Sequence, residues 1–450
     1  MESKMKFGKK FAFGLGDFGG NFCFSFISSF ALIYFTDIAG ANVLAISTLL
    51  LIAKALDGIT DLITGHLIDK THSKMGKARP WLFWSAFPLA IAMILLFSVP
   101  GDLGQQAKSA YIFIFYVLVC AFFYTANNIS YNALTALITN NEEDRVSMGS
   151  IRFMLTAVAG IIIGTLTTVL VQIFGTGQKG WTAVAALYAV IFLICTMITV
   201  FSVKEVNNSS VEGQRKNEVG WVQSVKILLT NRYFILVFII FLVMYIFTGL
   251  IGTAGTYYAK YILGNENMYG LLSIAMMIPM FLSLLFTPAL TKKFGMQKTG
   301  IGAGMLFIIG SLAGVIGGSS LPILLSGIVI RSFGMGPISA IIVTLSASVS
   351  DNIILKKKVN IEGMTFSCSS VGIKIGSGVG TALVGWLLAA VGYNGKDITD
   401  GAITMIQISY LFIPVILGIL VIVCFLFMNI EEENKRLRSA GKDKIQKCFK

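Results

Sequence analysis

About twelve apolar stretches, each near the 20 residues that a helix needs to cross a bilayer, follow one another along this chain. They are centred close to Phe24, Ala55, Ile91, Leu118, Ile162, Phe192, Met244, Met276, Phe307, Val329, Gly380 and Gly418. Only 13% of the residues are charged and the mean hydropathy is +0.80, values that a soluble domain of 450 residues does not show. The sequence therefore predicts an all-α integral membrane protein.

The distribution of the positive charges along the chain predicts its membrane topology. A net charge of +13 is also typical of nucleic-acid binding, but here the basic residues gather in alternate loops, as the positive-inside rule requires. They precede the first span and follow the second, eighth and tenth, whereas the turns around Asn42 and Ser319 carry none. We expect a multi-pass protein of the cell (cytoplasmic) membrane, with both termini cytoplasmic and no nucleic-acid partner.

Motifs for covalent chemistry are missing from the sequence. There are two histidines, no H-E-x-x-H and no G-x-x-x-x-G-K-[ST] loop for ATP, so neither an enzyme nor a cofactor is expected, and energy is expected from a gradient. Five of the six cysteines fall within apolar spans and Cys448 lies in the tail, which predicts no disulfides.

A polar segment divides the chain. Residues 204–232 read as a cytoplasmic linker between a six-helix half (1–203) and a second one (233–430), followed by a cytoplasmic tail (431–450). Two such halves are the architecture of the major facilitator superfamily, whose substrate site lies between them near the midplane. Gly65–Lys70 (G-H-L-I-D-K) and Pro288–Gly295 (P-A-L-T-K-K-F-G) both resemble its gating loop, and chance similarity of two basic loops is the alternative.

Charged residues within the second span indicate cation binding. Lys54, Asp57 and Asp61 stand at i, i+3 and i+7, which places them on one helical face. A charge at mid-bilayer costs about 2.5 to 3.5 kcal/mol, so it requires a partner or a wet cavity. Two neighbouring carboxylates can coordinate sodium or share a proton. The alternative is that Lys54 only neutralises one aspartate.

Polar groups on four other spans predict a substrate surface. Candidates for binding a hydroxyl-rich solute are Asp17, Asn21, Tyr124, Asn128, Tyr131, Asn132, Arg152 and Lys374. Amides and aromatic faces hold sugars, although helix packing and polar contacts between helices explain some of these residues equally well. Lys374 has no acidic neighbour in sequence, so we expect it to pair across helices or to snorkel.

Four motifs together are specific to one family: F-G-L-G-D-F-G-G-N-F from Phe13, Y-F-T-D-I-A-G from Tyr34, D-G-I-T-D from Asp57, and M-G-K-A-R-P-W ending at Trp81. They resemble the glycoside-pentoside-hexuronide:cation symporter family, and the similarity runs through nearly the whole chain. The resemblance implies a twelve-helix major facilitator fold and symport of a sugar with a monovalent cation by alternating access, working as a monomer in the lipid bilayer.

The resemblance also implies residue roles. Asp57 and Asp61, with Thr60 and Thr125, would form the cation site, and Asn21, Asn128 and Arg152 would face the sugar. A charge and gating network would include Lys54, Lys374, Asp69, Arg79, Asp351 and Glu362. The melibiose carrier of this family has aspartates in place of Asn21 and Asn128, and an asparagine in place of Thr60, which leaves both sodium and proton coupling open.

Other functions remain as alternatives. The same fold can carry a non-sugar solute or a lipid, and a transporter-like sensor can bind its ligand without moving it.

Overall fold

Helices form every secondary structure element in the described part of the computed structural model, which comprises residues 5–139, 142–205, 221–318, 320–359, 362–395 and 398–448. Among these residues, 11 helices are long and apolar enough to cross a membrane. One of them, α10 (Met268–Gly317), has 50 residues, more than twice what a bilayer of about 30 Å requires. It breaks at Gly295, where φ is 80°, so it supplies two spans and the expected number of about twelve is confirmed.

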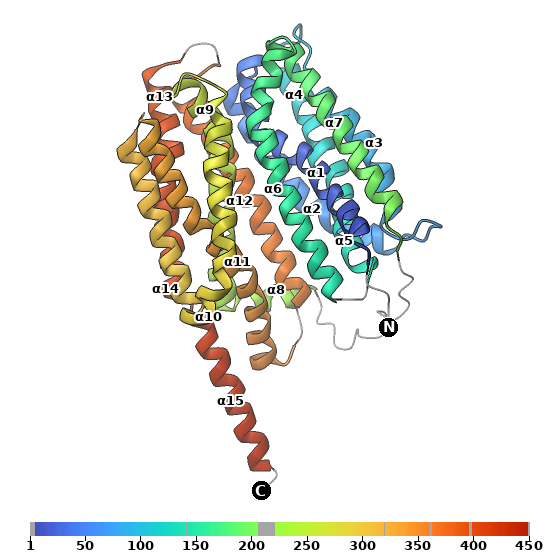
Figure 1. Ribbon diagram of the computed structural model, residues 1–450, viewed down its shortest axis with the longest axis vertical. Helices are drawn as coiled ribbons and strands as arrows, with labels where there is room; N and C mark the ends of the chain where they lie inside the picture. Colours follow the sequence, from blue (N-terminus) through green and yellow to red (C-terminus); the bar gives the residue numbers. More distant parts are fainter. Residues whose placement is uncertain are drawn as a thin grey trace. The chain divides into compact units, whose positions relative to one another are not determined.

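The elements can be followed along the chain in Figure 1. The first part contains α1 (Phe7–Ile33), η1 (Tyr34–Ile38), α2 (Val43–Asp69), α3 (Arg79–Leu96), α4 (Gln105–Val117), η2 (Leu118–Tyr124), α5 (Thr125–Leu137), α6 (Glu142–Ile173) and α7 (Gly177–Ser202). After α8 (Trp221–Leu229) follow α9 (Arg232–Tyr261), α10, α11 (Leu321–Lys357), α12 (Glu362–Ala390), α13 (Asp400–Gln407), η3 (Ile408–Phe412), α14 (Ile413–Leu426) and α15 (Ile430–Cys448).

Two compact units divide these helices differently from the halves expected from sequence. The first unit comprises Met1–Val211, Gly249–Ile274 and Gly378–Gln407, and the second contains the remaining segments. Parts of α9, α10, α12 and α13 therefore pack with the first six spans. The expected linker contains the short helix α8, and the expected tail is the helix α15.

A glutamate closes the loop between α2 and α3. Glu205 accepts hydrogen bonds from the backbone N–H groups of residues 77–79 at 2.7 to 3.0 Å, so it satisfies the unpaired donors at the N-terminus of α3. Arg79 donates to the carbonyl of Val200 at the end of α7. Gly76, with φ of 108°, lies so close to Glu205 that a Cβ there would stand 2.3 Å from the carboxyl carbon.

The second unit repeats this arrangement. Glu431 accepts from the backbone N–H of Met296 at 2.8 Å, and the Gln297 side chain donates to the carbonyl of Leu426 at 3.0 Å. Leu426 precedes Glu431 by the same five positions that separate Val200 from Glu205. The similarity of the two loop sequences is therefore matched by an internal structural repeat rather than by two unrelated basic loops.

Candidate functional site

A buried carboxylate and a hydroxyl meet where α2 crosses the fourth span. The side chain of Thr125 donates to Asp57, which is 6% exposed, and also to the carbonyl of Cys120 at 3.0 Å. Thr125 follows directly on the π-helical turn η2, whose wider winding leaves carbonyls without their usual partner in the helix. The π-turn thus positions a side-chain oxygen next to the Asp57 carboxylate, and two hard oxygen atoms are suited to a sodium ion or a proton.

Lys54 lies one turn before Asp57 and is 7% exposed. Its Nζ stands 5.0 Å from the centre of the Phe24 ring, which in turn stacks on Tyr124 at 5.6 Å. A cation over an aromatic face is stabilised by the ring quadrupole, more strongly when both are desolvated. Lys54 therefore packs its amino group against this aromatic pair and joins α1, α2 and η2.

A second charge pair connects α1 to α6. Arg152 Nε stands 3.1 Å from Asp17 Oδ2, and both side chains are about one-fifth exposed, at 18% and 21%. Arg152 also donates to Asn132 Oδ1 at 2.8 Å and to Thr135 Oγ1 at 3.2 Å. Thr156 donates to the same Asp17 oxygen at 3.3 Å. The charge of Asp17, which packing alone did not account for, is thus matched by Arg152.

The predicted amides lie along the same polar strip. Asn132 donates to Asn128 at 3.0 Å, and Asn128 donates to the Tyr124 hydroxyl at 3.5 Å. Asn21 donates to the Asp17 carbonyl at 2.9 Å and accepts from Ser25 at 3.1 Å. Through Tyr124 and Phe24, this strip continues to Lys54 and Asp57.

Two predicted site residues take other positions. Tyr131 is 2% exposed in an apolar cluster, its hydroxyl donates to the carbonyl of Phe13, and its ring lies under the Arg152 guanidinium at 4.5 Å. It therefore supports Arg152 rather than presenting a free hydroxyl to a ligand. Thr60 donates to backbone carbonyls of its own helix and lines a groove with Trp81 and Trp84.

Two of the predicted charge and gating residues have local partners. Arg79 is bound to α7 and Asp351 to α15, the latter through Arg438 Nη2 at 2.6 Å. Lys374 is half-buried on α12, and Asp61 is half-buried on α2. The side chains of Asp69 and Glu362 lie outside the described residues.

Sequence reasoning missed a cluster around Asp37, whose side chain is 2% exposed. Its carboxylate accepts from Lys260 at 2.6 Å, Tyr261 at 2.8 Å, Tyr393 at 2.7 Å and Thr36 at 2.8 Å. We call these five residues the Asp37 cluster. Asp37 belongs to the Y-F-T-D-I-A-G motif, but three of its partners follow more than 200 positions later, so no sequence spacing reveals them.

Burial raises the pKa of Tyr393 above its usual value, so its hydroxyl stays protonated and can donate to Asp37. The whole cluster lies within the first unit. It joins the end of the first span to the end of α9 and to the segment that follows α12.

Comparisons with known proteins identify the family of this chain. Residues 12–432 match the sequence model of a family described as MFS/sugar transport protein. The isoprimeverose transporter of Lactiplantibacillus pentosus is 28% identical over 94% of this chain and 89% of its own length. A glucuronide carrier protein homolog of Escherichia coli is 25% identical over 89% of this chain and 88% of its own, and a putative glycoside/cation symporter of the same organism is 27% identical over 91% and 88%.

Solved structures show the same fold at lower sequence identity. A mutant form of a nucleoside transporter superposes with a TM-score of 0.67 at 15% identity, covering 93% of this chain and 100% of that one. A D-xylose-proton symporter gives a TM-score of 0.64 at 14% identity, covering 93% and 97%. These likenesses establish the fold expected from the apolar spans.

Proposed function

Because the chain belongs to the MFS/sugar transport protein family, we propose that it is a secondary active transporter that moves a sugar together with a monovalent cation. The observation that carries the proposal is the polar strip from Asp57 through Tyr124 to Arg152 within the helix bundle. Relatives named as carriers of isoprimeverose and of glucuronide, and as a glycoside/cation symporter, support a glycoside, pentoside or hexuronide as the substrate.

In this proposal Asp57, Asp61 and Thr125 bind the cation, which is sodium or a proton. A buried carboxylate in an apolar bundle strongly favours a counter-ion, so a bound cation stabilises the arrangement of α2 against η2. Because η2 also carries Tyr124, whose hydroxyl contacts Asn128, occupation of the cation site affects the residues proposed to bind the sugar.

The sugar is held by Asp17, Asn21, Asn128, Asn132 and Arg152. Their carboxylate, amide and guanidinium groups offer both donors and acceptors, which matches hydroxyl groups that donate and accept. In the absence of sugar these groups bond to one another, so a sugar replaces contacts that the protein already makes.

The Asp37 cluster closes the end of the helices remote from the basic loops, and this end faces outside if the termini are cytoplasmic. Alternating access then requires these contacts to separate when the carrier opens outward. A single cation moving through 100 mV provides about 2.3 kcal/mol, enough to concentrate the sugar roughly 40-fold.

The test is transport by the purified protein in proteoliposomes. Galactosides, xylosides and glucuronides would be screened while internal pH and sodium are both recorded. We expect one sugar class to move sodium or protons, and Asp57→Asn to lower coupled uptake at least a hundredfold while sugar binding persists. Asp102→Asn, an exposed carboxylate in the loop between α3 and α4, serves as the matched control and should retain uptake.

Two outcomes would contradict the proposal. If sugars bind but no solute crosses the membrane, the protein is a sensor rather than a carrier. If uptake proceeds unchanged in Asp57→Asn, the cation does not act through α2.

A further inference from the structure

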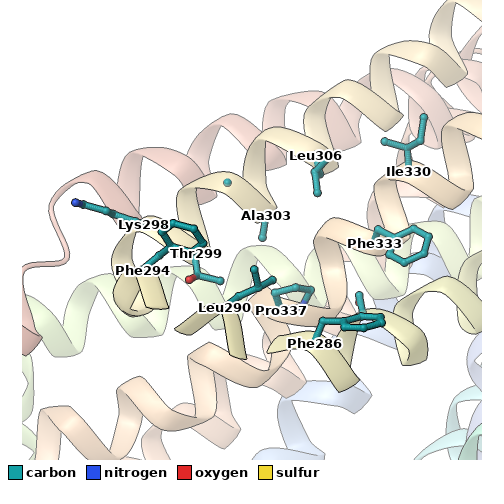
Figure 2. A pocket seen from close by; sticks show the side chains of 12 residues that line it. Phe286, Leu290, Phe294, Lys298, Thr299, Ala303, Leu306, Ile330, Phe333 and Pro337 are labelled. Atoms are coloured by element: carbon teal, nitrogen blue, oxygen red, sulfur yellow. The ribbon is translucent and has the colours of Figure 1, made fainter. Parts of the chain in front are cut away.

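An apolar groove lies on the second unit where the two parts of α10 meet α11. It has a volume of about 510 Å³ and is lined by phenylalanine, leucine and isoleucine side chains, including Phe286, Leu306 and Phe333. Figure 2 shows that these side chains line most of the groove, whereas the amino group of Lys298 lies at one end. We call this hollow the C-terminal groove.

The first unit carries a counterpart, the N-terminal groove, formed by α2, α3 and the fourth span with a volume of about 610 Å³. Three residues of α2, and Thr71 just after it, match four residues of α10 that stand 223 positions later, beginning with Thr60 and Ser283 (283 minus 60) and ending with Thr71 and Phe294. Five residues of α3 match five that stand 218 positions later, beginning with Pro80 and Lys298 (298 minus 80). The two grooves are therefore copies of one feature in the internal repeat.

The copies differ at their mouths. In the N-terminal groove, Trp81 and Trp84 stand where the C-terminal groove has Thr299 and Gly302, and the Trp81 indole donates to Thr71 at 2.7 Å, which closes one end. At Gly302 a Cβ would meet nothing within 4 Å. The C-terminal copy thus lacks the two indole side chains that line its counterpart.

The end of the C-terminal groove at Lys298 is positively charged. Lys298 is exposed and has no carboxylate partner among the described residues, and Lys292 and Lys293 are exposed on the same loop. Glu431, which reaches this loop, accepts from the backbone of Met296. An apolar channel ending in a free lysine matches a molecule with a long hydrocarbon chain and an anionic head.

We propose that the C-terminal groove binds an anionic phospholipid, with an acyl chain along Phe286, Leu306 and Phe333 and the phosphate at Lys298. The basic loops are those expected to face the cytoplasm, and the cytoplasmic leaflet is the one rich in anionic lipid. Because the acyl chain would lie between α11 and the two parts of α10, any rearrangement of these helices would change lipid binding.

The test is native mass spectrometry of the full-length carrier titrated with phosphatidylglycerol or with phosphatidylcholine. We expect a tightly retained phosphatidylglycerol, and about fivefold weaker retention in Lys298→Gln, as about 1 kcal/mol per lysine implies. Gly302→Trp, which copies the N-terminal groove, should displace the lipid, whereas Lys292→Gln on the same loop should retain it. Because the readout is lipid retention, it is independent of sugar transport.

Several results would overturn the proposal. Equal retention of both lipids would show that the charge of the headgroup does not determine binding. Unchanged lipid retention in both Lys298→Gln and Gly302→Trp would show that the lipid binds outside the C-terminal groove. A shift from dimer to monomer in Gly302→Trp would mean that a second copy of the chain covers the groove. Circular dichroism and thermal unfolding of each variant would establish that it is folded.

Discussion

At the scale of single residues, Arg152 links α1 to the amides of the fourth span. Its guanidinium reaches Asp17, Asn132 and Thr135 through three different nitrogen atoms, while the Tyr131 ring lies beneath it. Only a planar group with several fixed donors can make these contacts together, and a lysine ammonium, although charged, cannot.

We therefore expect Arg152→Lys to raise the sugar concentration needed for half-maximal transport about tenfold or more. Each hydrogen bond to a charged group contributes about 1.5 to 3 kcal/mol, and at least one is lost. Counterflow of labelled sugar in proteoliposomes measures the change. Arg438→Lys, in an exposed ion pair, is the matched control. If Arg152→Lys leaves the sugar concentration for half-maximal transport unchanged, Arg152 does not contact the sugar.

At the scale of elements, the repeated loop closures determine where α3 and the second part of α10 begin. Glu205 in one unit and Glu431 in the other supply a carboxylate to backbone N–H groups at the start of a span. In both places a glycine with positive φ brings the chain close to that carboxylate. The conformation of both loops is thus stabilised by a carboxylate that accepts from backbone N–H groups, next to a glycine with positive φ, more than by side-chain packing.

Gly76→Ala should destabilise the protein by about 1 to 3 kcal/mol, because an alanine at φ of 108° is strained and its methyl group would overlap Glu205. Thermal unfolding of the purified protein measures this. Gly65→Ala on α2, where a Cβ meets nothing within 4 Å, should be neutral or stabilising. If both substitutions have the same effect, the close approach to Glu205 has no energetic role.

At the scale of the whole molecule, the Asp37 cluster joins segments more than 200 residues apart within one unit. Removing one partner of a buried ion pair costs about 3 to 5 kcal/mol, so this cluster strongly holds these segments together at the end of the first span.

Asp37→Asn should therefore favour opening at this end. We expect a membrane-impermeant maleimide to label a cysteine at Ala41, which is 2% exposed, at least tenfold faster in Asp37→Asn than in the parent. Asp102→Asn, an exposed carboxylate in the loop between α3 and α4, is the control and should leave the labelling rate unchanged. Equal rates in all three proteins would show that the cluster does not hold this end closed.

Much of the architecture followed from the sequence alone. The twelve apolar spans required a helical membrane protein, because a bilayer leaves backbone hydrogen bonds no partner outside a helix or a closed barrel. Asp17, Asp57 and Arg152 were identifiable because a charge within an apolar span is costly unless it has a partner. The family motifs predicted the fold and the transporter class, and the comparisons confirmed both.

The tertiary structure alone decided which residues meet. It paired Asp57 with Thr125 through a π-turn, placed Tyr131 in the core beneath Arg152, and assembled the Asp37 cluster. Helical periodicity places side chains on a face, but it contains no information about which face of another helix lies opposite. That choice depends on how glycines, aromatic rings and kinks allow helices distant in sequence to approach each other, and therefore only the packed structure settles it.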